Sequence, residues 1–359
     1  MNNPVLPRLN ALATAVPGHD IHQAFIDWAA SRLTDERIRA LFARMAARSG
    51  IAHRWSVLPP TPAGGSPVAS DGFYDVPGLP PTSARMAAYA DHAPELALQA
   101  IAKLGDAFNP ARVTHIVVAS CTGFVAPGID QILARRLGLS SGVERVLIGF
   151  MGCYAGVTAL RTARHIVRSE PDAVVLVVSV ELSTLHLSLA DQPEPLLAML
   201  QFSDGAAAGI VSAAPHGLIL GEGRSLALED SGDLIRWTIG DKGFEMILSG
   251  EVPGRLRDAL AAPAVRESLF GGDPPPLLAV HAGGRSVLDA VEHALAVPAD
   301  SLADSRSVLA RFGNMSSATI LFVLADMMAR GAEGQGIAIA FGPGLAAEAI
   351  RFTAGGTEK

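Results

Sequence analysis

The sequence is poor in cysteine and has no long apolar run. Two cysteines in 359 residues are too few for a disulfide framework, which argues against a small secreted scaffold. The most apolar segments, AVVLVVSVEL and ATILFVLADMM, are shorter than the roughly 20 residues that a membrane-spanning helix needs. The N-terminal residues lack the charged and apolar regions of a signal peptide. We therefore expect a cytoplasmic protein without a membrane span.

Positive charge is also in short supply. The formal net charge is -7 and the sequence pI is about 5.8, so no large basic field is available to bind nucleic acid. The composition is 49% hydrophobic and 18% charged, which is typical of a globular protein with a large core. The length predicts two domains or one domain with an internal duplication.

Motifs for metals and nucleotides are missing as well. His19 and His22 form an H-x-x-H pair, but no cluster of further ligands accompanies it. The segment SDGAAAGIVSA, which begins at Ser203, lacks the flanking pattern of a dinucleotide loop and predicts a turn into a packed strand. We therefore expect no metal and no resident cofactor.

Apolar runs that alternate with helical patterns predict an α/β sheet with buried strands. Residues 31–55 predict a helix with Thr34 as its N-cap and a stop at Gly50, and the Pro- and Gly-rich residues 58–81 predict a long surface loop. The expected strands are ARVTHIVVAS (111–120), ERVLIGF (144–150), AVVLVVSVEL (173–182), PPLLAVHA (275–282) and GQGIAIAFGPG (334–344).

The two halves of the chain follow a similar spacing. Cys153 lies 32 positions after Cys121, Asn314 lies 33 positions after His281, and a glycine precedes both Cys153 and Asn314. An internal duplication explains this match, although all strand–helix–strand units have similar lengths. In a duplicated fold, Cys153 and Asn314 would begin equivalent helices beside one central site at the ends of the strands.

The residue types at these junctions suit catalysis. At a helix start, free backbone N–H groups and the helix dipole favour the thiolate of Cys153, and a neighbouring histidine would lower the thiol pKa further. His281 ends an apolar strand and faces a glycine loop, and Asn314 opens a helix. Taken singly, the three residues also fit a buried apolar cysteine, a core histidine and an N-cap.

Five motifs together resemble the type III polyketide synthases, the chalcone synthase-like family of the thiolase superfamily, over residues 37 to 345. They are GCYAG (152–156), FSDGAAA (202–208), HAGGRSVLD (281–289), FGNMSSA (312–318) and AFGPG (340–344). The resemblance implies a five-layered αβαβα fold, a homodimer and two thiolase-like halves. Residues 1–212 would carry the nucleophilic cysteine, and residues 213–359 the histidine and asparagine.

The resemblance also implies an acyltransferase activity. Cys153 matches the acyl-accepting cysteine, and His281 and Asn314 match the residues that stabilise the enolate formed when malonyl-CoA loses carbon dioxide. An acyl-CoA starter would then grow by two carbons per round toward an alkylpyrone- or resorcinol-type product. Coenzyme A thioesters would be the only substrates, and no acyl carrier protein would be required.

Further residues match substrate-binding positions of the family, by resemblance alone. Phe202 and Phe244 match gatekeepers between the CoA tunnel and the reaction cavity, and Arg54 is the candidate for the CoA phosphates. Plain core packing also explains the phenylalanines, and a solvated helix face explains the arginines of residues 31–55. The remaining substrate-binding candidates are Cys121, Thr122, His186, Gly283 and Ser316.

The sequence departs from plant members of the family, which indicates a bacterial type. Ala282 replaces a proline, Ser203 replaces a glycine, and His186 replaces a smaller polar residue. Ala126 stands where plant enzymes present a methionine, so we hypothesise that the lost bulk opens a tunnel for a long fatty acyl starter.

Three other functions remain open at this stage. A ketoacyl synthase of the fatty-acid initiation type uses the same three residue types on the same fold, with an acyl carrier protein as its partner. A thioester hydrolase could use a Cys-His-Asn triad, in which the asparagine orients the histidine. A catalytically silent binding homologue is the third possibility.

Overall fold

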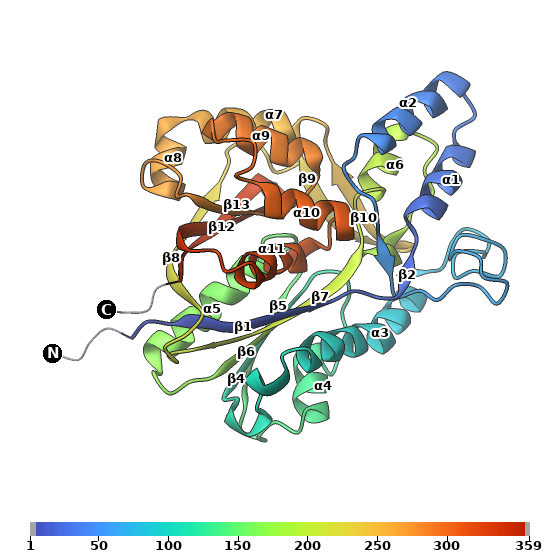
Figure 1. Ribbon diagram of the computed structural model, residues 1–359. Coiled ribbons are helices and arrows are strands. Elements are labelled where there is room, and N and C mark those ends of the chain that lie inside the picture. The colour runs from blue at the N-terminus through green and yellow to red at the C-terminus, as the bar shows by residue number, and fades with distance from the viewer. Residues whose placement is uncertain (1–4, 356–359) are drawn as a thin grey trace.

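The computed structural model describes residues 5–355, and their central feature is a nine-stranded sheet in the order β11-β12-β13-β8-β1-β7-β6-β4-β5 (Figure 1). Its strands are β1 (Arg8–Ala15), β4 (His115–Ser120), β5 (Glu144–Gly149), β6 (Val175–Leu182), β7 (Asp204–Ser212), β8 (Leu218–Ala227), β11 (Leu277–Val280), β12 (Gly334–Gly342) and β13 (Ala346–Ala354). Two short pairs lie outside this sheet: β2 (His19–Asp20) with β3 (Trp55–Ser56), and β9 (Ile235–Gly240) with β10 (Gly243–Leu248).

Strand pairing divides the large sheet into two similar parts. In the first part, β4 pairs with β6 in parallel, and β6, β7 and β1 follow in antiparallel order. In the second part, β11 pairs with β12 in parallel, and β12, β13 and β8 follow in antiparallel order. The two parts meet through a short pairing of β1 with β8. The predicted duplication is therefore confirmed, and the predicted boundary after residue 212 falls directly behind β7.

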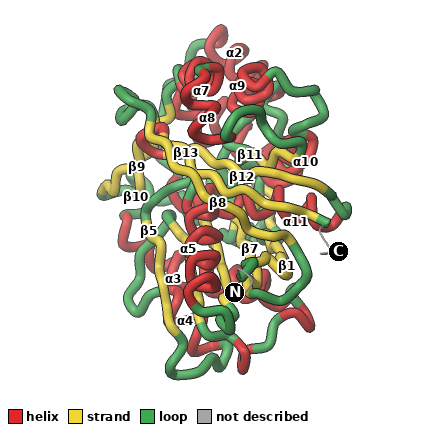
Figure 2. Tube along the Cα trace, turned by 90° about the vertical axis from the view of Figure 1, so that its left-hand side faces the viewer, coloured by secondary structure: helices red, strands yellow, loops and turns green. Residues whose placement is uncertain are grey.

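The helices complete five layers, as predicted (Figures 1 and 2). One outer layer holds α3 (Thr82–Ala102) and α4 (Ile129–Arg136), and the middle layer between the two sheet parts holds α5 (Ala155–Ser169) and α11 (Thr319–Ala329). The other outer layer holds α7 (Val252–Ala261), α8 (Pro263–Phe270), α9 (Arg285–Leu295) and α10 (Ala303–Phe312). A separate group consists of α1 (His22–Arg32), α2 (Glu36–Ala47) and α6 (Pro193–Met199).

Burial on both faces explains the continuous apolar strands. In β4, Ile116 and Val118 pack in the same core as α3, whereas Val117 and Ala119 pack in the same core as α5. Alternate residues of a strand point to opposite faces, so a strand covered by helices on both sides must be apolar throughout.

One difference between the halves concerns the element that follows α4 in the first half and α9 in the second. In the first half, β5 lies between α4 and α5 and extends the sheet beyond β4. In the second half, the chain between α9 and α11 forms α10, and β11 is the edge strand. The sequence spacing alone did not predict this difference.

The prediction of one helix over residues 31–55 is wrong. The chain forms α1 and then α2, and the N-cap of α2 is Asp35 instead of Thr34. A side-chain oxygen of Asp35 accepts hydrogen bonds from the backbone N–H groups of Arg37 at 2.7 Å and Ile38 at 3.3 Å, which satisfies two free donors of the first turn. The predicted loop over residues 58–81 is confirmed.

A tight contact in the middle layer brings the starts of α5 and α11 together. Gly156, in the first turn of α5, approaches the backbone of Ser317 so closely that a Cβ atom would collide with the Ser317 carbonyl oxygen. Gly152 has a φ of 79° and lies against Pro343, where a side chain would also collide. Both glycines therefore allow the segment around Cys153 to approach the other half of the molecule.

Across residues 5–355, the structure contains no helix with both the length and the apolar character needed to cross a bilayer. The cytoplasmic location expected from the sequence stays a prediction.

Candidate active site

Cys153 lies two residues before α5 and directly after Gly152. Its side chain is half-buried and borders a small cavity of about 20 Å³. Four of the predicted substrate-binding residues border the same cavity, namely Cys121, Thr122, Phe202 and Ser316. The structure therefore places both cysteines of the chain at one cavity.

Asn314 lies two residues before the 3-10 turn η4 (Ser316–Ala318) that leads into α11, and its side-chain amide is close enough to the Cys153 thiol to lower the thiol pKa. Asn314 Nδ2 also donates to the Gly283 carbonyl oxygen at 3.3 Å, and its Oδ1 accepts from the Ser316 N–H at 2.9 Å. The last bond is a local turn contact two residues along the chain and orients the Asn314 side chain; the N-cap residues are Met315 for η4 and Ala318 for α11.

His281 follows β11 directly, and its backbone N–H donates to the Ile339 carbonyl oxygen at 2.8 Å. The ring is buried, and neither ring nitrogen has a hydrogen-bond partner among the residues that the structure describes. A Cβ atom at Gly283 would lie 3.4 Å from His281 Nε2, so this nitrogen is close to the glycine whose carbonyl accepts from Asn314. Contacts through Gly283 and Asn314 therefore link His281 to Cys153.

Burial decides the charges of these groups. Burial raises the pKa of the Cys153 thiol to about 12; hydrogen bonds from Ser316 and Asn314 lower it only in part, and the nearby Glu181 carboxyl raises it further. Burial also lowers the pKa of His281 to about 3. Both groups are therefore neutral near pH 7. The thiolate predicted from the helix start is wrong for the free protein, because desolvation of the sulfur outweighs the backbone N–H groups.

Glu181, which the sequence analysis missed, lies buried at the end of β6 next to this cavity. Its carboxyl oxygens accept from the Thr122 hydroxyl at 2.8 Å, from the Cys121 N–H and from the Ser317 hydroxyl. Burial raises the pKa of Glu181. In the sequence, Glu181 is the one acid in the otherwise apolar run AVVLVVSVEL. A carboxyl group in such a buried strand needs several hydrogen-bond donors, which could have indicated a polar site there.

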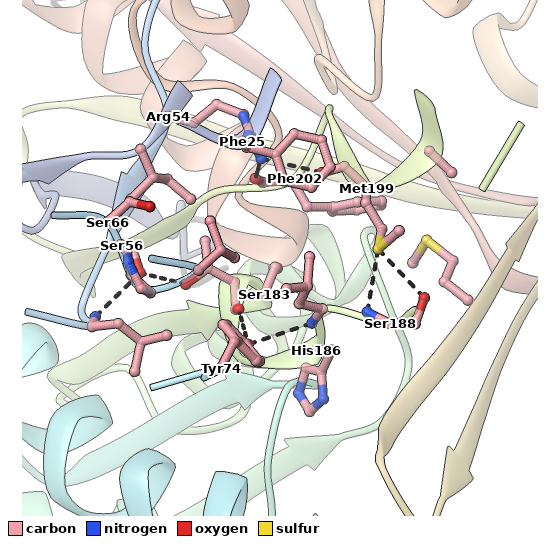
Figure 3. Close-up of a pocket in the computed structure, with 18 of the residues that line it drawn as sticks. Phe25, Arg54, Ser56, Ser66, Tyr74, Ser183, His186, Ser188, Met199 and Phe202 are labelled. Carbon is pink, nitrogen blue, oxygen red and sulfur yellow. Dashed lines mark hydrogen bonds between the residues drawn. The ribbon is translucent and has the colours of Figure 1, made fainter. Parts of the chain in front are cut away.

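A larger cavity of about 80 Å³ adjoins the small one (Figure 3). Phe202 borders both cavities, as do Trp237 and Met246, which the sequence analysis missed. Phe244 borders only the larger cavity. Phe244 and Met246 share one face of β10 because they are two residues apart, so their spacing alone does not distinguish them.

His186 borders the larger cavity but has no ring nitrogen free for a ligand. Its Nε2 donates to the Thr122 carbonyl oxygen at 2.7 Å, and its Nδ1 accepts from the Phe244 N–H at 3.0 Å. The ring stacks on Phe244 at a centroid distance of 4.2 Å, and burial lowers the pKa of His186 to about 3. His186 therefore acts as a rigid, neutral part of the wall.

Arg54 is buried in the wall of the larger cavity and is not part of an exposed basic face. Its Nη1 donates to the carbonyl oxygens of Phe202 at 2.9 Å and Met199 at 3.2 Å, and its Nε donates to His22 Nδ1 at 3.1 Å. Arg54 thus fixes the segment that carries Phe202. A contact with the CoA phosphates stays a prediction.

Ala126 lies on the surface of the chain and borders neither of these two cavities. Its role in opening a tunnel also stays a prediction.

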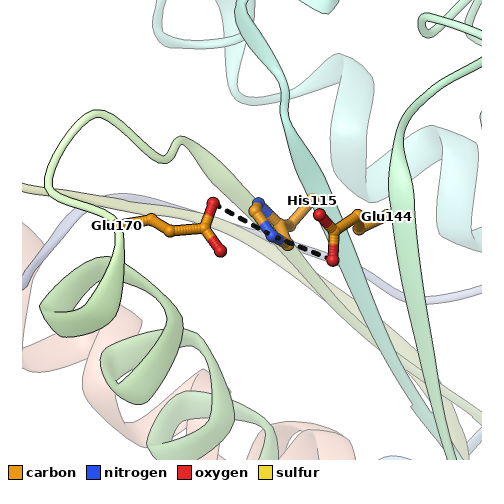
Figure 4. A group of neighbouring side chains, drawn as sticks. All are labelled: His115, Glu144 and Glu170. Atoms are coloured by element: carbon orange, nitrogen blue, oxygen red, sulfur yellow. Dashed lines mark ion pairs between the residues drawn. The ribbon is translucent and has the colours of Figure 1, made fainter.

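A second polar cluster lies at the opposite end of β4 (Figure 4). Nε2 of the buried His115 is 3.6 Å from a Glu144 carboxyl oxygen and 3.8 Å from a Glu170 carboxyl oxygen. Both carboxylates are exposed, so solvent screens their interaction with the ring. No predicted site residue belongs to this cluster.

Comparisons with known proteins agree with this arrangement. The family models for the N-terminal and C-terminal domains of chalcone and stilbene synthases match residues 6–215 and 228–354. The chain is 31% identical to "Alpha-pyrone synthesis polyketide synthase-like Pks18" of Mycobacterium tuberculosis, over 96% of this chain and 90% of that protein. It is 32% identical to the bisdemethoxycurcumin synthase of Oryza sativa subsp. japonica, over 77% of this chain and 74% of that protein.

Solved structures give the same result. The crystal structure of PKS-I from the brown alga Ectocarpus siliculosus matches with a TM-score of 0.85 and 26% identity, covering 98% of this chain and 99% of that one. The C-terminal type III polyketide synthase domain of Steely1 from Dictyostelium matches with a TM-score of 0.85 and 25% identity. The match covers 97% of this chain and 99% of that one. The chain therefore belongs to the chalcone and stilbene synthase family and is an acyltransferase-type enzyme, a type III polyketide synthase with the thiolase-like fold.

Proposed function

We propose that this enzyme joins an acyl-CoA starter to malonyl-CoA by repeated decarboxylative condensation and releases an alkylpyrone- or resorcinol-type product. The observation that carries the proposal is the contact set around Asn314, whose amide lies next to the Cys153 thiol and donates to the carbonyl oxygen of Gly283, the glycine beside the unpartnered ring of His281. The printed name of the mycobacterial relative, with alpha-pyrone synthesis in it, supports the product class.

The first step is acyl transfer to Cys153. Because the thiol is neutral at rest, its proton moves to His281 as the sulfur attacks the thioester carbonyl carbon of the starter. The carbon–sulfur bond to coenzyme A then breaks, and the departing sulfur takes the proton from the imidazolium. The ring returns to its neutral form, which burial favours.

The second step is the loss of carbon dioxide from malonyl-CoA. The bond to the carboxylate carbon breaks, and its electrons form an enolate whose oxygen accepts hydrogen bonds from His281 and Asn314. No hydrogen bond within the described residues fixes the tautomer of His281, so the ring can offer a lone pair in the first step and an N–H in the second. The enolate carbon then attacks the acyl carbon on Cys153, the carbon–sulfur bond breaks, and the departing thiolate takes a proton from solvent to restore the neutral thiol.

Each of these steps needs only a nucleophile, a proton carrier and hydrogen-bond donors. We therefore propose that coenzyme A carries both substrates, that no acyl carrier protein is required, and that no resident cofactor takes part.

The two cavities support a proposal for the starter. Phe202, Trp237 and Met246 stand between the small cavity at Cys153 and the larger cavity. Since these side chains border both spaces, we propose that a shift of them would join the two cavities. We propose that the acyl chain of a medium- or long-chain starter extends from Cys153 past these residues into the larger cavity.

We also propose a homodimer that forms along β5. This strand is the last in the order of the large sheet, so one of its edges is unpaired. Val146 and Leu147 on β5 are 37% and 46% exposed, and the nearby Phe124 is 45% exposed. An apolar, unpaired edge strand favours pairing with another chain, and a second copy of this strand offers the same edge.

The condensation is tested by incubating the purified protein with labelled malonyl-CoA and starters from acetyl- to stearoyl-CoA, without a carrier protein. We expect carbon dioxide release and a pyrone or resorcinol by mass spectrometry. Asn314→Ala should slow decarboxylation about 10²- to 10³-fold, because one donor to the enolate is lost. Cys153→Ala should abolish acyl loading.

The control for these variants is His216→Asn, an exposed residue that borders neither cavity. Release of free acid from the starter without carbon dioxide would point to a thioester hydrolase. A strict need for an acyl carrier protein would point to a ketoacyl synthase. Either result contradicts the proposal.

The role of the larger cavity is tested with Trp237→Ala. Removal of the indole merges the two cavities, so the ratio of long to short starters accepted should rise about tenfold or more over that of the parent enzyme. The half-buried Trp28→Phe serves as a control for the loss of a tryptophan. An unchanged ratio, or a parent enzyme that prefers acetyl-CoA to every longer starter, would contradict this placement of the acyl chain.

The dimer is tested by light scattering in solution. The parent protein should have twice the mass of one chain. Leu147→Glu should reduce the mass to that of a single chain, since a charge at a buried apolar contact is costly. Ile239→Glu, on the exposed hairpin strand β9, should stay dimeric. A parent protein that is monomeric at micromolar concentration would disprove the interface.

A further inference from the structure

Arg54 has one terminal nitrogen without a partner. Its Nε donates to His22, and its Nη1 donates to two backbone carbonyl oxygens, of Phe202 and Met199. Its Nη2 is buried and has no hydrogen-bond partner among the described residues. The guanidinium carbon lies 4.5 Å from the centroid of the Phe25 ring, which is a weak acceptor at best. Two N–H donors of a buried cation are therefore free.

This cation borders the larger cavity and is the only charged side chain among the described residues that line it (Figure 3). Burial lowers the pKa of Arg54 to about 9, so the side chain keeps its charge near pH 7. A buried donor without a partner is costly, and a charged donor more so, unless an acceptor is supplied.

Several other polar groups of this cavity are already engaged. The Ser56 hydroxyl pairs with the Thr184 hydroxyl at 2.7 Å, the Tyr74 hydroxyl donates to the Thr184 carbonyl oxygen, and both nitrogens of His186 are bonded. Among the described residues that line this cavity, Arg54 is therefore the one cation with a donor that no hydrogen bond occupies.

We infer that Arg54 selects a starter whose acyl chain carries an oxygen acceptor, a hydroxyl, carbonyl or carboxylate oxygen, at the end remote from the thioester. This inference rests on the proposed function, since it takes Cys153 as the point where the starter is attached. A chain that ends in a methyl group would place hydrocarbon against Nη2 and leave the donor unpaired. A chain that ends in an oxygen accepts a charge-assisted hydrogen bond there.

Matched starter pairs test this inference on the unaltered, full-length protein. Octanoyl-CoA is compared with 8-hydroxyoctanoyl-CoA and with the C8 ω-carboxyacyl-CoA, and the same series is repeated from about six to twelve carbons. The readout is kcat/KM for condensation with malonyl-CoA, with product masses to identify the starter used. Sites built to bond a substrate hydroxyl reject analogues that lack it, so we expect the oxygen-ended starter to be favoured about tenfold or more at one chain length.

The comparison between the hydroxyl and carboxylate ends identifies which oxygen is recognised. Equal or better use of the methyl-ended starter at every chain length would overturn the inference. Carbon dioxide release from malonyl-CoA is followed in the same reactions. If no starter supports condensation, the proposed function itself fails; if condensation occurs without a preference for oxygen, only the present inference fails.

A pair of variants isolates the side chain. Arg54→Lys keeps a positive charge but loses the guanidinium fork. The ratio of kcat/KM for the oxygen-ended starter to that for the methyl-ended starter should therefore fall close to one. Arg85→Lys is the matched control, because Arg85 is also fully buried with an unpartnered Nη2 but does not border the larger cavity. The preference is a ratio between two starters in one preparation, so partial misfolding of a variant cancels. A preference that survives Arg54→Lys would also overturn the inference.

Discussion

The desolvation of Cys153 and His281, where the two halves meet, is the constraint on which the rest of the structure depends. Desolvation holds the thiol and the imidazole neutral, although a helix start and two hydrogen bonds act in favour of the thiolate. The same enclosure excludes water from the oxygen of an enolate. Water at that place would weaken each hydrogen bond that the protein donates to the enolate oxygen. Without competing water, hydrogen bonds from the protein can therefore strongly stabilise the negative charge of the enolate.

The duplicated fold supplies this burial. Each half places a glycine and one functional residue just before a helix of the middle layer, and Gly156 lets those two helix starts approach within backbone contact. Cys153 from one half and Asn314 from the other thereby come close enough for the Asn314 amide to lower the pKa of the thiol. His281 joins them from the end of β11, through the short loop at Gly283. Chemistry at the centre thus depends on packing between elements that are far apart in the sequence.

Features that repeat along the chain could be predicted, and features set by distant contacts could not. The matched junctions predicted that Cys153 and Asn314 converge, because equivalent helices start at equivalent places. The charge of Cys153 depends on how many atoms surround the sulfur, which spacing does not report. Arg54 lies in an arginine-rich segment whose pattern predicts a solvent-exposed helix face. In the structure its side chain is buried instead, and it donates to carbonyl oxygens more than 140 positions away in the sequence. Met246 and Phe244 share one strand face, so pattern alone could not separate them.

The central claim, a neutral thiol at rest, is tested most directly by the pH dependence of Cys153 alkylation by iodoacetamide in the free protein, followed by peptide mass. Only the thiolate reacts, so a pKa of about 12 predicts a rate that rises about tenfold per pH unit from pH 6 to pH 10 without levelling off. A rate that reaches a plateau with a midpoint below pH 7 would show a thiolate in the resting site and contradict the account.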